Sequence, residues 1–334
     1  MYQSIEESRS KNCLGAVALS LIIYNTTGMK RKYIIGLVLI IVIGTMIGVY
    51  LYKLSVYRAT ARVAPTRNDG GKISVVASFY PLYFITSEIG GEKIEVKNMT
   101  PAGVEPHDYE PTARDMMDIQ RAKLLILNGG KFEAWGEKIN EDLKNTGVIV
   151  VEAGQGLFEG NDPHVWLSPE LVKKQSRIIL ENLVQIDPVN ETYYSENAKI
   201  LDDKLNKLQT EYLSGLVSCQ RREFVTSHDA FGYLASEFGL TQVPIAGLTP
   251  EEEPSTKLLT EIVRFVKERE IKYIFFERLA SPKLAETIAE EVGIKILVLD
   301  PIEGISDNDM EQGKNYFSLM EENLANLRIA LECQ

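Results

Sequence analysis

The stretch Asn190–Leu216, NETYYSENAKILDDKLNKLQTEYLSGL, divides the sequence and decides its fold. It contains no proline, and its only glycine is Gly215. Apolar side chains recur at the spacing of one face of an amphipathic helix, at Leu201, Leu205, Leu208 and Tyr212. At about 1.5 Å per residue such a helix reaches roughly 40 Å, which is long enough to connect two domains as a strut. The alternative interpretation is an ordinary surface helix of a single domain.

Short apolar runs alternate with helix-compatible segments on both sides of this stretch. Strands are expected at 73–78, 94–99, 124–128, 148–151, 223–226, 241–245, 273–277 and 294–299. Strands that are apolar on both faces and alternate with helices are typical of a parallel sheet covered on both sides. The sequence therefore predicts an α/β protein of two lobes, each with a parallel sheet flanked by helices. The N-terminal lobe is expected at 72–188, the linking helix at 189–217 and the C-terminal lobe at 218–334.

Composition limits the classes of partner. The chain has 334 residues, 45% of them apolar, which is enough to fill the cores of two domains. The formal net charge of −11 argues against a nucleic-acid partner, which normally requires a basic face. A cation is the better electrostatic match.

An apolar segment near the N-terminus predicts attachment to a membrane. Residues Tyr33–Tyr52 read YIIGLVLIIVIGTMIGVYLY without a charge, and a helix of this length crosses the roughly 30 Å of bilayer hydrocarbon. The basic run Lys30–Lys32 precedes it, so the positive-inside rule places everything after Lys53 outside the cytoplasm. We expect an uncleaved transmembrane helix within an anchor at 29–53. The alternative is a signal peptide cleaved near 59–61.

The regions on either side of this anchor have weaker patterns. Residues 54–71 contain turn formers without periodicity, which is typical of a flexible tether. Residues 1–28 form an uncertain N-terminal extension, because Met29 would itself make a suitable start for the anchor.

The three cysteines indicate one disulfide bond. Cys13 precedes the anchor and is expected in the cytoplasm, whereas Cys219 and Cys333 follow it. An even number of cysteines outside the membrane can pair, so a disulfide between Cys219 and Cys333 is predicted. Two free buried thiols are the alternative.

Each of the three histidines follows a predicted strand. They occur in the runs GVEPHDYEP, NDPHVW and VTSHDA, as His107, His164 and His228. Asp300 ends the last predicted strand in the run LVLDP. Because ligands of parallel sheets bind beyond the carboxyl ends of the strands, these four side chains are expected to meet in a cleft between the lobes.

Three imidazoles and one carboxylate form a ligand set that suits Zn²⁺, with Mn²⁺ second because manganese prefers more oxygen ligands. Asp300 could instead cap a turn before Pro301. The rival fourth ligands are Glu105, Glu110, Glu277 or a water molecule. An apolar wall around the site is expected from Tyr109, Trp166 and Phe231, although core packing would explain these residues as well.

Five runs, GVEPHDYEP, DPHVWLSP, SHDAFGYLA, GLTPEEEPS and LVLDP, occur in this order within about residues 72–333. Together they resemble the zinc/manganese solute-binding proteins of ABC uptake transporters, the ZnuA/TroA type. The resemblance implies two α/β lobes joined by one long rigid helix, with the metal ion held between them. Carried over by position, it implies that His107, His164, His228 and Asp300 bind the ion.

Two departures from this family affect the ligand prediction. Some members carry a glutamate ligand immediately before the first histidine, and here that position is Pro106. Many zinc members also carry a loop rich in histidine and aspartate, whereas residues 131–160 contain no histidine. Histidine rather than glutamate at position 228 resembles the zinc branch.

The resemblance implies a binding protein and not an enzyme. It would capture Zn²⁺, or alternatively Mn²⁺, outside the cell and deliver it to a permease driven by a cytoplasmic ATPase. We expect a monomer held at the cell membrane by its N-terminal anchor. A zinc-dependent hydrolase is an alternative, although catalytic zinc usually keeps one position open for water. A surface adhesin on the same fold is the other alternative.

Overall fold

The computed structural model describes residues 44, 46, 48, 71–250, 252, 254–279 and 283–334. The predicted anchor, extension and tether therefore lie outside the described residues, apart from Gly44, Met46, Gly48 and Gly71. Among the residues that are described, no helix is both long enough and apolar enough to cross a membrane. The lobes described below belong to one compact unit that ends at Gln334.

The first lobe contains a four-stranded parallel sheet with the strand order β2-β1-β3-β4. Its strands are β1 (Ile73–Ala77), β2 (Ile94–Asn98), β3 (Leu124–Leu127) and β4 (Ile149–Glu152). All four residues of β3 are buried, which accounts for its continuous apolar sequence LLIL. From β1 the chain goes to β2 at one edge of the sheet, and it then crosses to β3 on the other side of β1. The direction of the strand order therefore switches between β1 and β3. Ligands of such sheets bind beyond the carboxyl ends of the strands at this switch.

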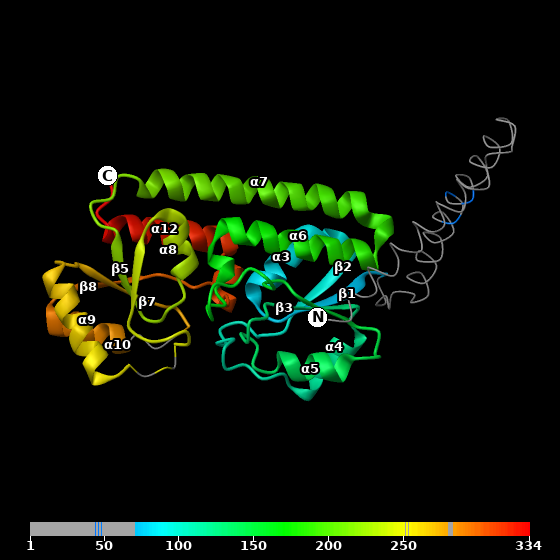
Figure 1. The fold of residues 1–334 in the computed structure, drawn as a ribbon, viewed down its shortest axis with the longest axis horizontal. Helices are drawn as coiled ribbons and strands as arrows, with labels where there is room; N and C mark the ends of the chain where they lie inside the picture. Colours follow the sequence, from blue (N-terminus) through cyan, green and yellow to red (C-terminus); the bar gives the residue numbers. More distant parts are fainter. Residues whose placement is uncertain are drawn as a thin grey trace, which may run out of the picture. The chain divides into compact units, whose positions relative to one another are not determined.

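Helices cover both faces of this sheet (Figure 1). Helices α3 (Tyr80–Gly90) and α6 (Pro169–Ile186) pack on one face, and α4 (Ala113–Arg121) and α5 (Gly136–Leu143) pack on the other. Short 3-10 turns occur at η1 (Gly91–Lys93), η2 (Val165–Leu167) and η3 (Pro188–Asn190). Ser168 caps α6 through its hydroxyl, and Pro169 stands at the first position of the helix, where its missing N–H costs no hydrogen bond.

The second lobe repeats this strand order as β6-β5-β7-β8, again all parallel. Its strands are β5 (Glu223–Thr226), β6 (Thr241–Pro244), β7 (Tyr273–Phe276) and β8 (Lys295–Val298). Its helices are α8 (Gly232–Phe238), α9 (Thr256–Glu268), α10 (Lys283–Val292), α11 (Asp307–Glu311) and α12 (Tyr316–Ala330). Helices α9 and α10 cover one face, while the other face packs toward α8 and α12. The predicted two-lobed α/β fold is confirmed.

The long helix α7 (Glu191–Leu216) runs along both lobes (Figure 1). It packs against α3 and α6 in the first lobe and against α8 and α12 in the second. Its buried face carries the predicted apolar residues, extended at both ends, as Tyr194, Ala198, Leu201, Leu205, Leu208, Tyr212 and Leu216. One hydrophobic core contains residues of both sheets together with this face of α7. The helix therefore joins the lobes and is not a surface helix of one of them.

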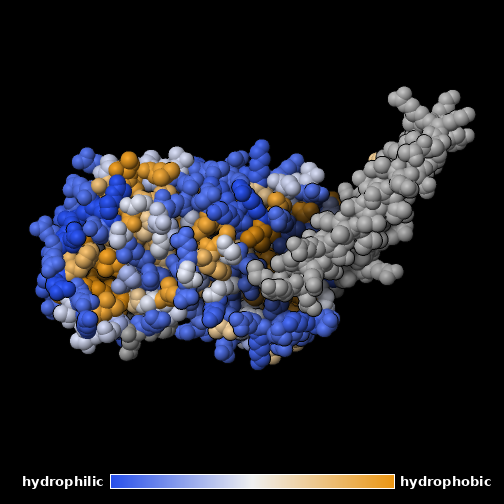
Figure 2. Space-filling model, viewed as in Figure 1, coloured by the Kyte–Doolittle hydropathy of each residue, from blue (hydrophilic) through white to orange (hydrophobic). Residues whose placement is uncertain are grey.

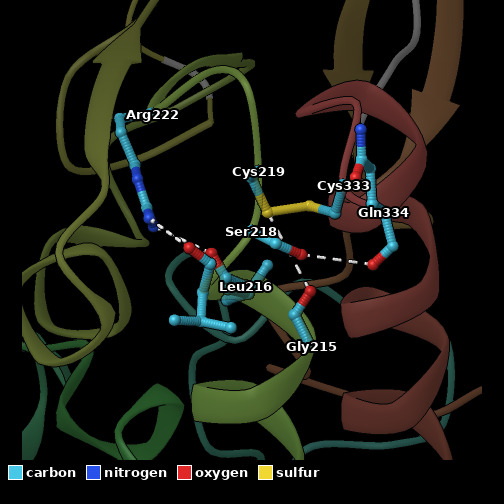
Figure 3. The surroundings of a disulfide bond; sticks show 8 residues. Gly215, Leu216, Ser218, Cys219, Arg222, Cys333 and Gln334 are labelled. Atoms are coloured by element: carbon cyan, nitrogen blue, oxygen red, sulfur yellow. Dashed lines mark hydrogen bonds between the residues drawn. A yellow bond between two sulfur atoms is a disulfide. The ribbon is translucent and has the colours of Figure 1, made fainter.

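A disulfide bond joins Cys219, just after α7, to Cys333 at the end of the chain (Figure 3). Next to it, the Ser218 hydroxyl donates to the carbonyl oxygen of Gln334 at 3.2 Å. Because the two cysteines are 114 residues apart, the bond closes a loop that contains most of the second lobe. This is the pair that the cysteine count predicts.

Hydrophilic residues predominate on the face shown in Figure 2, with hydrophobic residues between them in smaller groups. This distribution agrees with an acidic chain in which a quarter of the residues are charged.

Candidate metal centre

Four loops bring the candidate ligands together, two from each lobe. His107 lies between β2 and α4, and His164 lies after β4, immediately before η2. His228 follows β5, and Glu303 follows β8. Each loop begins at the carboxyl end of a parallel strand, which is where the sequence predicts the ligands of such sheets.

The three imidazoles and the Glu303 carboxylate converge on one point. One ligand atom from each of the four residues lies within 4.8 Å of the other three. The Glu303 Oε1 atom is 3.4 Å from Nε2 of His107, 3.3 Å from Nε2 of His164 and 3.5 Å from Nε2 of His228. The side chains of His164 and His228 are fully buried, and that of Glu303 is 1% exposed. The structure therefore brings all three predicted histidines into one buried cluster.

The inward-facing atoms of this cluster have no hydrogen-bond partner. They are the three imidazole Nε2 atoms and both carboxylate oxygens of Glu303. Buried polar atoms are normally satisfied, because each one left without a partner costs free energy. Three nitrogen lone pairs and a carboxylate around one point fit the tetrahedral coordination of Zn²⁺ by nitrogen and oxygen.

Two carboxylates orient two of the imidazoles. Asp162 Oδ1 lies 2.7 Å from Nδ1 of His164 and also accepts the backbone N–H of that residue at 2.9 Å. Glu277 Oε1 lies 2.7 Å from Nδ1 of His228 and accepts its backbone N–H at 3.2 Å. A carboxylate facing Nδ1 keeps the proton there and leaves the Nε2 lone pair directed at the cluster.

These contacts shift the pKa values of three residues of the cluster. Burial lowers the pKa of His164, but its hydrogen bond with Asp162 and its contact with Glu303 outweigh burial, so the pKa is raised. The pKa of His228 is raised well above its usual value in the same way, with Glu277 and Glu303 outweighing burial. Burial raises the pKa of Glu303, yet the three surrounding imidazoles hold it well below the usual range. The metal-free cluster thus favours an ionised Glu303 carboxylate beside protonated His164 and His228.

Asp300, the predicted fourth ligand, does not belong to the cluster. Its carboxylate accepts the backbone N–H of Ile302 at 2.8 Å and pairs with Arg278 Nε at 2.9 Å. Burial raises the pKa of Asp300 to about 6 although Arg278 and the hydrogen bond from Ile302 lower it. The prediction that Asp300 is the fourth ligand is therefore wrong, because its carboxylate does not face the histidines. The alternative, that Asp300 caps a turn, agrees with its hydrogen bond from Ile302. Glu303, three residues further along, is the carboxylate that faces the histidines.

The rival carboxylates also lie elsewhere. Glu105 accepts the backbone N–H of His107 at 3.2 Å, and Glu110 is exposed to solvent. Glu277 contacts the far side of the His228 ring, at Nδ1 rather than Nε2. None of the three belongs to the cluster found among the described residues.

Aromatic rings line one side of the site. The ring of Trp166 lies 5.1 Å from that of His164, as predicted, and the ring of Phe132 lies 4.6 Å from that of His107. Tyr109 instead donates its hydroxyl to Asp115 at 2.6 Å. Phe231 packs in the core against Phe224, with ring centroids 6.5 Å apart. The wall was therefore predicted correctly only at Trp166, and Phe132 was missed.

A fold of two α/β lobes joined by one long helix, with a buried ligand cluster between them, defines the class of two-lobed solute-binding proteins. The sequence matches the family described as "Zinc-uptake complex component A periplasmic" over residues 75–330. The chain belongs to this family.

Similar proteins and structures agree with this assignment. The "High-affinity zinc uptake system protein ZnuA" of Bacillus subtilis is 39% identical over 284 residues, 79% of this chain and 89% of that protein. The crystal structure of the Zn(II)-bound ZnuA-like domain of Streptococcus pneumoniae AdcA has a TM-score of 0.71 and 38% identity, covering 78% of this chain and all of that one. The laminin-binding protein Lmb of Streptococcus agalactiae, described as a bifunctional protein with adhesin and metal transporting activity, has a TM-score of 0.71 and 35% identity, covering 78% of this chain and 99% of that one.

Some relatives are longer than this chain. It spans 56% of the length of the zinc-binding lipoprotein AdcA of Streptococcus pneumoniae, to which it is 37% identical. The match to that protein is therefore a match to about half of it.

Proposed function

We propose that this chain is the extracytoplasmic binding component of an ABC-type metal uptake transporter. In this role it captures Zn²⁺ through His107, His164, His228 and Glu303 and delivers the ion to a membrane permease driven by a cytoplasmic ATPase. The observation that carries the proposal is the buried cluster itself, with ligand atoms within 4.8 Å of one another and no other hydrogen-bond partners. Membership of a family of zinc-uptake components supports it.

The ligand types favour zinc over manganese. Zn²⁺ is bound well by imidazole nitrogen in four-coordinate sites, whereas Mn²⁺ prefers more oxygen ligands at higher coordination numbers. Three neutral imidazoles and one carboxylate leave a bound Zn²⁺ with a net charge near +1. Mn²⁺ is the second candidate.

We infer from the burial of the site that the protein captures and releases a metal ion and does not catalyse a reaction. Four protein ligands would complete the coordination of Zn²⁺, whereas catalytic zinc keeps a position open for water. Because His164 and His228 are fully buried, an ion can enter or leave only when the ligand loops move apart. We therefore propose a small closure of the lobes with reversible coordination and no chemical turnover.

We also propose that the chain acts as a monomer held at the cell membrane by residues 33–52, with the lobes outside the cytoplasm. Protease treatment of intact cells, followed by detection of the two ends of the chain, tests this arrangement. Protection of the lobes from protease in intact cells, with cleavage after lysis, would contradict it.

Titration of the purified chain with Zn²⁺ and Mn²⁺ in competition tests the metal assignment. The expected result is one Zn²⁺ per chain, bound more tightly than Mn²⁺. Replacement of His107, His164, His228 or Glu303 by alanine should each weaken binding strongly, because the remaining ligands no longer complete the tetrahedral set. Elemental analysis showing far less than one equivalent of metal, together with no measurable affinity, would reject the proposal.

Neither alternative function is proposed. The adhesin activity described for Lmb belongs to that protein. A hydrolase would need an open metal position, which a site of four protein ligands does not offer.

A further inference from the structure

Asp300 is held rigidly although it is not in the ligand cluster. It is 4% exposed, and each of its polar groups has a partner. The Asn323 side chain on α12 accepts the backbone N–H of Asp300 at 2.8 Å and donates to its carbonyl oxygen at 2.7 Å. A buried residue whose backbone and carboxylate groups are all paired fixes the chain on either side of it.

The residue between Asp300 and Glu303 that needs such support is Ile302. Its φ is +56°, in the left-handed region that β-branched side chains rarely adopt. A conformation of this kind persists only where the surroundings determine it. The Asp300 Oδ1 atom supplies this constraint, because it accepts the N–H of Ile302 at 2.8 Å and closes a turn directly before Glu303.

An ion-pair network holds the other oxygen of Asp300. Arg278, which follows β7, places Nε 2.9 Å from Asp300 Oδ2 and also bonds through its guanidinium to Glu322 on α12. Lys314 joins the same network at 2.9 Å from Glu322. The guanidinium is planar with fixed donors, so it locks the orientation of the carboxylate that it bridges.

We propose that Asp300 is a positioning residue for Glu303. Its carboxylate holds the turn at Ile302 that directs Glu303 toward the three imidazoles, and Arg278 fixes Asp300 in that role. The inference rests on the proposed function, since it assigns Asp300 an effect on the metal through Glu303 and no contact with the metal.

A double-variant experiment on the purified chain tests this, with Zn²⁺ as the probe. Glu303→Ala should weaken binding the most, and Asp300→Ala should weaken it by about 10- to 100-fold, as substitutions behind a metal ligand commonly do. Once Glu303 is absent, Asp300 has nothing to position. The variant that combines both substitutions should therefore bind Zn²⁺ as Glu303→Ala does, within about twofold.

Co²⁺ provides a second readout, because its visible absorption reports the ligand set. The spectrum of Co²⁺-loaded Asp300→Ala should shift toward that of Co²⁺-loaded Glu303→Ala. If Asp300→Ala does not fold, Asp300→Asn keeps an acceptor for the Ile302 N–H and removes only the charge that faces Arg278. The Co²⁺ spectrum of Asp300→Asn should show a smaller shift in the same direction. Arg278→Met should shift the spectrum by a similar amount.

Asp187→Asn is the matched control. Asp187 is also a buried aspartate, accepting the hydroxyl of Tyr194 at 2.7 Å where α6 meets α7. This substitution should lower the Tm and leave Zn²⁺ affinity and the Co²⁺ spectrum unchanged.

Two results would overturn the inference while leaving the proposed function intact. One is wild-type Zn²⁺ affinity in both Asp300 variants. The other is a loss of Zn²⁺ affinity from Asp300→Ala that is equally large in the wild-type chain and in Glu303→Ala. Such a result would mean that Asp300 does not act through Glu303. Failure of the unaltered chain to bind Zn²⁺ would instead reject the proposed function.

Discussion

Trp166 and Pro301 form a hydrogen bond across the two lobes. The indole N–H of Trp166 donates to the Pro301 carbonyl oxygen at 2.7 Å, and both groups are buried. Trp166 lies two residues after His164, and Pro301 lies two residues before Glu303. The bond therefore joins the loops of two candidate ligands from different lobes. Tyr316 supports it from α12 by donating its hydroxyl to the Trp166 carbonyl oxygen at 2.7 Å.

Trp166→Phe should lower both stability and Zn²⁺ affinity. The substitution leaves the carbonyl oxygen of Pro301 buried without a donor, which costs about 1–3 kcal/mol. Thermal unfolding without metal and a Zn²⁺ titration measure the two effects. Trp135→Phe is a matched control, because Trp135 is the only other tryptophan and lies partly exposed at the start of α5. Equal effects of the two substitutions would contradict a special role for the Trp166 bond.

Asp162→Asn and Glu277→Gln should each weaken Zn²⁺ binding by about 10- to 100-fold while keeping all four candidate ligands. An amide can present its NH₂ group to Nδ1, which favours the tautomer whose Nε2 carries the proton and cannot bind metal. Isothermal titration at constant pH measures the change. Glu332→Gln is the control, since Glu332 pairs with Lys272 on the surface at 2.7 Å. Unchanged affinity in both site variants would show that the carboxylates do not set the tautomers.

Zn²⁺ affinity should already fall as the pH drops from 8 toward 7. Without metal, the pKa values of His164 and His228 are raised above the usual 6.5. Their protonated forms are therefore favoured in the metal-free protein up to a higher pH, and Zn²⁺ must displace those protons. The affinity should change about tenfold per pH unit for each proton released.

Titrations in buffers of different ionisation enthalpy count the released protons directly. A profile that stays flat until the pH falls below 6.5 would show that the histidines titrate as isolated imidazoles.

The stability of the metal-free fold changes with pH in the opposite direction to the Zn²⁺ affinity. A group with a raised pKa stabilises the folded state at low pH, and this contribution is lost as the pH rises through the raised value. Stabilisation of the fold by added Zn²⁺ should therefore grow from pH 6 to pH 8.

The sequence was sufficient to predict the elements that position the site. Helix α7 was predictable because its buried face repeats apolar residues at helical spacing over 26 residues. The start of α6 was predictable because Ser168 and Pro169 are local signals that need no information from the rest of the chain. The three histidines were predictable as a group because each follows a strand of a parallel sheet, and such strands end at one edge.

The fourth member of the cluster was not predictable in the same way. Asp300 and Glu303 both follow β8, and no local pattern distinguishes which carboxylate faces the histidines. That choice depends on the left-handed turn at Ile302 and on Arg278, which is distant in sequence. Phe132 was missed for a related reason, since only the folded loop after β3 brings its ring to His107.

Loss of the Cys219–Cys333 disulfide should lower stability without changing the ligand cluster. The bond closes a loop between residues 114 positions apart, and a cross-link over such a distance restricts the unfolded chain. Removing it by Cys219→Ser with Cys333→Ser should cost about 2–5 kcal/mol, seen as a lower midpoint of denaturant unfolding. The mass of the untreated chain should be about 2 Da below that of the reduced chain.

The same double substitution should leave Zn²⁺ affinity within about twofold of the wild-type value. The four candidate ligands lie in loops at the carboxyl ends of the strands, whereas the cysteines flank the start of β5 and the end of α12. An unchanged unfolding midpoint, or equal masses before and after reduction, would show that the bond is absent or has no effect on stability.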